Sequence, residues 1–217
     1  MLNSSVENIE FNKNNNLFSI YVKNKVYKSK FCIAAIPKPD LLKFSILHKY
    51  TSLLKSINTK SLCRIYSIFS KDDIWFKNIG KSTTNNNSRY IIPIDKENGL
   101  IMISYSDSKF ADYWHNLYES NEGNQKNIIK KLKNNIYKTF DIKINNPIYT
   151  QLCYWDVGTA FWKKNRDSSI ISKKIIQLND DIPFFICGEN YSETQGWMEG
   201  ALETSGHIVK ILNSRYL

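Results

Sequence analysis

An α/β fold of the α+β kind is predicted for this chain of 217 residues. Short apolar runs typical of strands alternate with longer stretches in which apolar residues recur at helical spacing. A composition of 42% hydrophobic and 13% aromatic residues is sufficient for the core of one large domain or two small ones. We therefore expect a globular protein in which strands and helices share a core.

The first predicted elements are two strands at residues 17–22 and 30–36. A polar turn at residues 23–25 separates them, and Pro37 ends the second strand because proline cannot donate to a strand ladder. This order is typical of a hairpin that leads into a buried strand. Leu41-Leu42 follow Pro37, and a helical pattern then continues through Tyr50, Leu53, Leu54 and Ile57.

The rest of the chain is predicted to contain five strands and three helices. The strands are residues 62–69, 90–94, 100–105, 148–155 and 183–187, and the helices are residues 110–117, 128–140 and 197–212. A segment rich in Asn, Ser and Thr at residues 83–88 predicts a mobile surface loop.

The formal charge of +10 raises the possibility of a nucleic-acid partner. The lysines are scattered among asparagines and isoleucines, and no nucleic-acid motif accompanies them, which favours a solvated surface and makes nucleic acid an unlikely partner. A basic surface would also repel polyamines. The four cysteines lie far apart without a Cys-x-x-Cys pair, so free buried thiols are expected, rather than disulfides or a metal site.

No apolar run approaches the roughly 20 residues needed to span a bilayer. The polar start of the chain also lacks the basic and apolar regions of a signal peptide. We therefore expect an intracellular, cytoplasmic protein with no membrane partner.

The most specific segment is the C-terminal one, in which an apolar strand ends at Gly188-Glu189 and a polar loop leads into a helix at Trp197. Small residues at the start of that helix would let its backbone approach a flat or anionic group. The N–H groups there have no helical partner and carry partial positive charge. This pattern favours a cofactor site, and the alternative is a helix whose small residues only permit close packing on its neighbours.

The order of several segments resembles the flavin-containing amine oxidases, which include the monoamine and polyamine oxidases. The segments are Phe31–Pro37, a strand from Leu62 that ends near Trp75, Trp155 followed by Gly158, and Cys187–Glu189 before Gly196–Ala201. The resemblance covers nearly the whole chain and only the second half of the family's usual sequence. It implies a partial FAD-binding domain of the dinucleotide type at residues 1–37 and 155–217. Residues 38–154 would then form a substrate domain with a mixed sheet flanked by helices.

The resemblance also implies the residues of a site. Cofactor contacts would come from Pro37, Trp155, Gly188, Glu189, Gly196, Trp197, Met198 and Ala201. Trp197 would be one of two aromatic walls that guide an amine to the flavin, and Phe161 or Trp162 the other. Core packing is the alternative for each aromatic residue, and for Glu189 the alternative is capping of the loop that follows.

Many relatives have a lysine on a strand of the substrate domain, where it is involved in the reaction with oxygen. The alignment puts Arg64 at or beside that position, and Lys60 is the alternative residue for it. Arginine is not equivalent to lysine, so the oxidase activity could be altered. The alternative for Arg64 is an arginine that alternates out of a strand to the surface. The cysteine that tethers FAD covalently in some relatives is missing beside Thr159-Ala160, so any FAD would be bound noncovalently.

The function implied is oxidation of an amine by hydride transfer to FAD, followed by imine hydrolysis, with oxygen as acceptor. The Gly-x-Gly-x-x-Gly turn that holds the cofactor pyrophosphate has no counterpart in these residues. Two further readings follow from that departure. One is a catalytically inactive remnant with a binding or structural role, and the other is a separate chain that supplies the N-terminal FAD-binding half.

Overall fold

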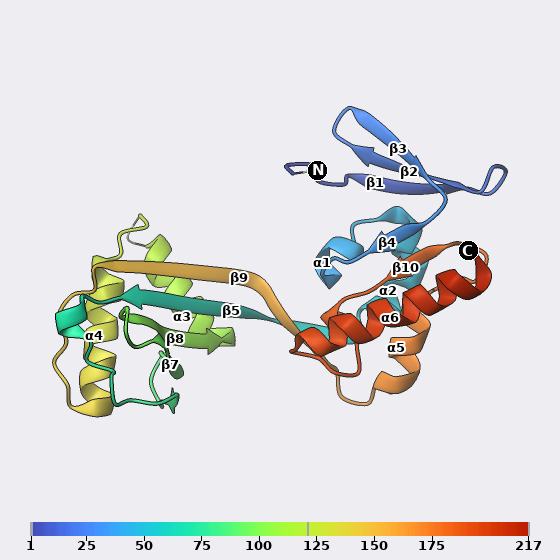
Figure 1. Cartoon of the computed structure of the whole chain (residues 1–217). Helices are drawn as coiled ribbons and strands as arrows, with labels where there is room; N and C mark the ends of the chain where they lie inside the picture. Colours follow the sequence, from blue (N-terminus) through green and yellow to red (C-terminus); the bar gives the residue numbers. More distant parts are fainter. Residues whose placement is uncertain (1, 121, 217) are drawn as a thin grey trace. The chain divides into compact units, whose positions relative to one another are not determined.

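A computed structural model of the chain confirms the α+β fold and describes residues 2–120 and 122–216 (Figure 1). The chain forms two compact units, one of Met1–Thr59 with Thr159–Leu217 and the other of Lys60–Gly158. Residues 38–59, which were expected in the substrate domain, lie in the first unit. They do so because Leu41, Leu47 and Leu54 are buried in that unit's core.

The first unit begins with an antiparallel sheet of three strands, in the order β1-β2-β3. These are β1 (Asn8–Asn12), β2 (Leu17–Val22) and β3 (Lys25–Ser29). The hairpin turn is therefore Lys23-Asn24, and Lys23 has a φ of 51° there. The strand expected at residues 30–36 is reduced to β4 (Cys32–Ala34).

β4 pairs in parallel with β10 (Phe184–Ile186), and the two form a sheet of their own. Around it lie the helices of the first unit. They are α1 (Lys38–Leu41), η1 (Ser45–Tyr50), α2 (Thr51–Leu54), α5 (Ser168–Ile176), η3 (Glu189–Tyr191) and α6 (Met198–Arg215). The helix expected through Tyr50, Leu53, Leu54 and Ile57 is observed as the short α2, which ends before Ile57 because that residue already begins β5.

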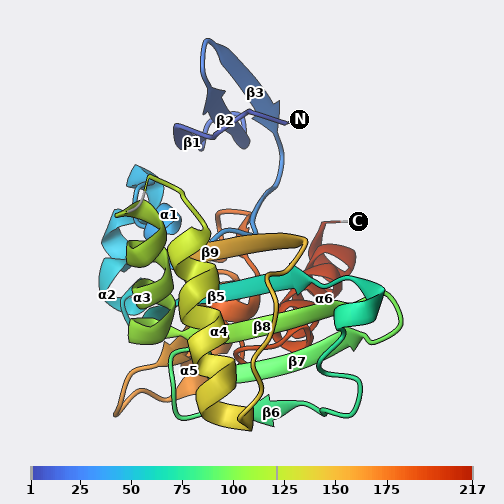
Figure 2. The ribbon, with the colours of Figure 1, turned by 90° about the vertical axis from the view of Figure 1, so that its left-hand side faces the viewer.

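The second unit is built on a five-stranded sheet in the order β6-β7-β8-β5-β9. Its strands are β5 (Ile57–Ile68), β6 (Ser82–Thr83), β7 (Tyr90–Asp95), β8 (Leu100–Asp107) and β9 (Tyr149–Trp162), and the short helix η2 (Lys71–Asp73) follows β5. Helices α3 (Ser108–Glu119) and α4 (Lys126–Phe140) cover one face of it (Figure 2). Trp114, Ile128 and Ile136 from these helices share a core with Ile65 and Ile103 of the sheet.

The segment at residues 83–88 is only in part the surface loop that its composition predicts, because Thr83 and Asn85 are exposed while its other residues pack into the second unit. Thr84 and Ser88 are buried. Asn135 Nδ2 donates to Ser88 Oγ at 3.1 Å, and Trp114 Nε1 donates to the Asn87 carbonyl at 2.8 Å. Its polar side chains and carbonyls therefore pair with α3 and α4, which satisfies buried groups that composition alone assigns to solvent.

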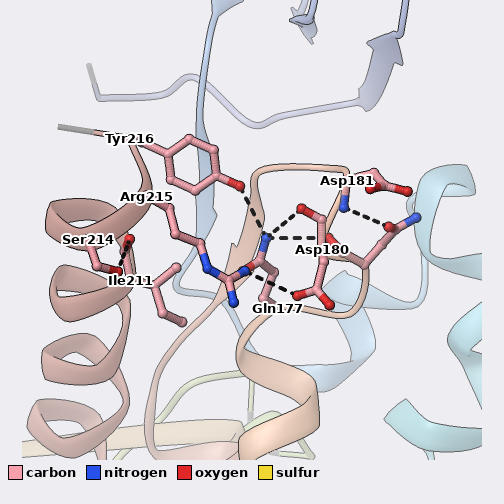
Figure 3. Close-up of polar contacts among 8 residues, drawn as sticks. Gln177, Asp180, Asp181, Ile211, Ser214, Arg215 and Tyr216 are labelled. Atoms are coloured by element: carbon pink, nitrogen blue, oxygen red, sulfur yellow. Dashed lines mark hydrogen bonds and ion pairs between the residues drawn. The ribbon is translucent and has the colours of Figure 1, made fainter.

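The end of α6 is held to the segment that precedes β10 (Figure 3). Arg215 forms an ion pair with Asp180 at 3.3 Å, and Gln177 Nε2 lies 3.5 Å from the Tyr216 hydroxyl. Tyr216 also packs edge-on against Phe31 at 5.3 Å between ring centroids. Among the helices that the structure describes, none has the length and apolar character required to cross a membrane.

Candidate functional site

The C-terminal loop begins at Gly188, which is separated from the end of β10 by Cys187 alone. Its φ of 121° lies in a region that side chains other than glycine rarely adopt, so the turn out of the strand requires glycine. The Gly188 N–H donates to Thr204 Oγ1 at 3.0 Å. This bond ties the beginning of the loop to the second turn of α6.

The Glu189 carboxylate organises the loop. Its Oε1 accepts from Thr159 Oγ1 at 3.2 Å, from the Ala160 N–H at 3.2 Å and from the Gly196 N–H at 2.7 Å. Its Oε2 accepts from Asn190 Nδ2 at 2.9 Å. Of the two roles expected for Glu189, this geometry supports capping of the loop, because both oxygens already have donors within the protein.

Two glycines of the loop and helix are also required by local geometry. Gly196 has a φ of 85°, which again favours glycine. A Cβ at Gly200 would overlap Ser192 Oγ and the Thr194 carbonyl oxygen. The small residue at Gly200 therefore lets α6 pack on its own loop, as in the packing alternative considered for this helix.

The start of α6 exposes an apolar pair beside its first-turn amides. Trp197 is the N-cap residue, and among the described residues its side chain makes no capping hydrogen bond. Trp197 is 69% exposed and Met198 is 79% exposed. A helix start of this kind can stabilise negative charge on a flat group placed against the two side chains.

The other predicted residues of the first unit differ in how free they are to meet a ligand. Trp162 Nε1 donates to the Ser192 carbonyl at 3.1 Å and its ring packs against Tyr191 and the core, so its position supports a structural role. Phe161 is more exposed than its neighbour Trp162. Pro37 lies next to the loop, because the following Lys38 N–H donates to Asn190 Oδ1 at 3.1 Å. Ala201 is half-buried on α6.

The second unit brings Arg64 and Trp155 together. The Arg64 guanidinium lies 5.0 Å from the centre of the Tyr105 ring and 5.9 Å from that of Trp155, and its buried Nε has no hydrogen-bond partner among the described residues. Burial opposes the charged form, but hydrogen bonds with Tyr66 and Tyr105 outweigh it and raise the pKa of Arg64. Arg64 is thus a fixed cation among aromatic rings, not a freely exposed surface residue. Lys60 precedes it on the same strand.

The histidines and cysteines lie outside this set of residues. His115 stacks on Tyr154 at 4.0 Å, and the Tyr154 hydroxyl donates to Asp112 Oδ1. All four cysteines are free, as predicted, although only Cys32 and Cys63 are buried. Burial raises the pKa of the Cys32 thiol to about 11 and that of Cys63 to about 12, so neither thiol is activated.

Sequence reasoning missed the residues that hold the loop in place. Asn190 and Thr204 join it to α1 and to α6, and Gln195 Nε2 donates to the Asn190 carbonyl at 2.6 Å. The available signal was a dense run of short polar residues beside glycines, which is typical of side chains that bond to nearby backbone.

Comparison with known proteins gives little beyond the residues themselves. No family model matches the chain. The chain is similar to the uncharacterized protein R188 of Acanthamoeba polyphaga mimivirus, with 21% identity over 120 residues. The match includes 50% of this chain and 24% of the viral protein, so the chain spans about a quarter of the length of that relative.

Proposed function

We propose that this chain is the second half of a flavin-dependent amine oxidase and binds the flavin end of FAD noncovalently. The observation that carries the proposal is the start of α6, where two large apolar side chains stand exposed beside first-turn amides that no side chain caps. The backbone conformation of the loop requires glycine at positions 188 and 196, and packing requires it at position 200. Neither requires tryptophan and methionine to stay in solvent at positions 197 and 198.

Each residue has a proposed role that follows from its surroundings. The amides of Met198 and the following residues would face the part of the flavin that becomes negative, and Trp197 would form an apolar wall for the amine. Within the second unit, Arg64 and Trp155 form a cationic and aromatic surface, and the part proposed for them in the reaction follows from the family resemblance. Phe161 is the better candidate for the second aromatic wall, because its side chain is more exposed than that of Trp162. Bound FAD would supply the hydride acceptor for oxidation of the amine.

The residues fit the flavin end of FAD and leave its pyrophosphate end without a holder. The chain has no Gly-x-Gly-x-x-Gly turn, and its parallel sheet contains only β4 and β10 among the described residues. We therefore propose that a separate chain contributes the remaining FAD contacts. A cytoplasmic location, an amine substrate and oxygen as acceptor belong to the same proposal.

The second candidate is an inactive remnant with a binding or structural role. The observation that favours it is Arg64, which cannot be deprotonated in proteins and which the resemblance puts at or beside the position where many relatives of the proposed family have lysine. A protein of this kind would keep the loop and α6 without oxidising amines.

A flavin titration separates the two. The purified chain is mixed with FAD, excess FAD is removed, and the visible absorbance of bound flavin is recorded for the wild type, Trp197→Ala and Val209→Ala. Val209 is an exposed residue of the same helix, about 18 Å further along its axis. We expect yellow protein for wild type and Val209→Ala, and at least several-fold weaker binding for Trp197→Ala. A wild-type chain that stays colourless at saturating FAD contradicts the proposal that this chain by itself holds the flavin end of FAD.

A further inference from the structure

Helix α6 has an exposed apolar stripe along one side. Leu202 is 71% exposed and Val209 is 53% exposed, and Met198 precedes them with 79% exposure. Ser205 lies between Leu202 and Val209, so the intervals along the stripe are four, three and four residues. Residues at a mean interval of about 3.5 form the seam between two packed helices. The stripe therefore has the spacing of a helix–helix contact.

The core of the first unit does not use this stripe. The buried residues of α6 are Gly200, Thr204 and Ile208, and they lie on another side of the helix. Because these residues already anchor α6, exposure of Leu202 and Val209 is not required for packing within the unit. A row of exposed apolar side chains on a helix that is already packed favours an interaction surface.

The middle of the stripe is small. Ser205 Oγ donates to the Leu202 carbonyl at 3.0 Å within the helix, so burial of the hydroxyl would not leave it unpaired. A Cβ at the neighbouring Gly206 would meet nothing within 4 Å. Small residues at a crossing point let two helix axes approach to the short end of the usual range of about 8–10 Å. The stripe thus has large residues on both sides of a small centre, and this pattern matches itself when it is turned end for end.

The charged residues beside the stripe favour one direction of pairing. Glu199 and Glu203 lie in the first half of α6 and Lys210 lies in the second. In the part of the chain that the structure describes, none of the three forms an ion pair. Neither glutamate has a lysine or arginine three or four residues away on the helix. Two parallel copies would put these carboxylates side by side, whereas two antiparallel copies put them beside the lysine of the other helix.

We propose that α6 pairs with α6 of a second copy of this chain in an antiparallel, two-fold symmetric contact. Leu202 of each copy would pack against Val209 of the other, which puts the two-fold axis between Ser205 and Gly206. The central contacts do not include Trp197, and the inference does not depend on flavin binding.

The same register pairs the charges. With Leu202 opposite Val209, Lys210 lies opposite position 201 of the other copy, midway between Glu199 and Glu203. Each lysine is then within about two residues, or about 3 Å along the axis, of either carboxylate. The apolar seam and the charges therefore select one register and one direction. A single helix pair is smaller than a standard interface of roughly 1,200–2,000 Å², so we expect a dimer that dissociates in the micromolar range.

The first test is sedimentation equilibrium of the full-length chain from low micromolar to submillimolar concentration. We expect the mass to rise from 25.4 kDa toward twice that value. Leu202→Glu should weaken association at least tenfold, because it puts a charge into the seam. The matched control is Ile170→Glu, which changes a 63% exposed apolar residue of α5 and should leave association unchanged.

Charge reversal tests the direction of pairing. Lys210→Glu alone and the double variant Glu199→Lys with Glu203→Lys should each associate at least tenfold more weakly than the wild type, because each brings like charges together. An equimolar mixture of the two variants should form a heterodimer. Recovery in the mixture would show that both variants are folded.

Disulfide trapping tests the register. Ser205→Cys should form a cross-linked dimer with oxidised glutathione, because residue 205 lies next to the two-fold axis. Met198→Cys should not, since the two copies of residue 198 would be about 22 Å apart along the axis, whereas a parallel pair would link at both positions. The proposal is overturned if the wild type stays a monomer at every concentration, if Leu202→Glu associates as well as Ile170→Glu, if the mixed charge variants do not recover association, or if Met198→Cys links as readily as Ser205→Cys.

Discussion

Replacing Gly200 by alanine tests whether this glycine serves packing of the loop or approach of a ligand. A Cβ at Gly200 would overlap Ser192 Oγ, Ser192 Cβ and the Thr194 carbonyl oxygen. The Ser192 hydroxyl already donates to the Glu189 carbonyl at 2.9 Å, and the Thr194 oxygen belongs to the backbone, so relief requires the loop to move. Overpacking of this kind typically costs about 1–3 kcal/mol.

Gly206 provides a matched control in the same helix. A Cβ there would meet nothing within 4 Å. Alanine is favoured over glycine in a helix by about 1 kcal/mol, so Gly206→Ala should stabilise the unit by up to about that amount. The helix contribution is of the same kind in both variants and largely cancels in their comparison. We expect Gly200→Ala to be less stable than Gly206→Ala by about 1–3 kcal/mol.

The assay must report the first unit, because a chain with two compact units does not have to unfold in one step. Amide exchange of α6, followed by mass spectrometry across a urea series, gives the free energy of opening of this helix in each variant. Equal stabilisation by the two substitutions would refute the packing described here for the loop. The small size of Gly200 would then have to serve a group that approaches from outside the unit.

Two further predictions concern the loop and the response to alkaline pH. Glu189→Gln should destabilise the loop by about 1–3 kcal/mol, because one oxygen of the charged Glu189 carboxylate accepts three hydrogen bonds. Faster amide exchange of residues 189–197 would show this loss of stability. Glu193→Gln, at an exposed residue, is the control, and equal effects of the two substitutions would contradict the role of Glu189 in holding the loop. Stability should fall as pH rises above about 9, because burial raises the folded-state pKa of Cys32 to about 11 and of Cys63 to about 12, so that the unfolded chain loses these protons first. Each thiol contributes a slope of at most about 1.4 kcal/mol per pH unit. The urea midpoint of the second unit, which contains Cys63, should therefore drop between pH 9 and 11 in the wild type and less steeply in Cys63→Ala, and an unchanged slope in that variant would count against the assignment.

Local patterns were sufficient where an element buries a continuous stripe. The helix expected at residues 128–140 is observed as Lys126–Phe140, because Ile128, Leu132 and Ile136 repeat at helical spacing and all face the core. The strand at residues 100–105 was found for a similar reason, since Ile101 and Ile103 alternate into that core.

Elements whose residues face solvent escaped the same reasoning. β3 (Lys25–Ser29) is an edge strand that no buried alternation marks, and its first residue, Lys25, was assigned to a turn. Helix α5 was also missed, although Asp167 before its first turn is a standard N-cap residue and accepts from the Ile170 N–H. The first omission has no local signal to correct it, whereas the second does.

The role of Glu189 could not be read from its neighbours. Two of its donors, Thr159 and Ala160, lie about 30 residues away in the sequence and reach it only because β9 ends beside the loop. A carboxylate before a glycine-rich loop is equally compatible with a ligand contact and with a cap. Only the tertiary structure shows which donors are already present.

The motif that carries the family resemblance mixes two kinds of residue, and only one kind bears on activity. Gly188, Gly196 and Gly200 are each required by the backbone or packing of the loop, so a chain that had lost its cofactor would still keep them. Trp197 and Met198 satisfy no such requirement, because they remain exposed at the start of α6. Exposed apolar side chains favour burial against something, and the first-turn amides beside them favour a group that carries negative charge. The glycines therefore report how the loop folds, and the flavin proposal depends on the two residues that the loop itself does not need.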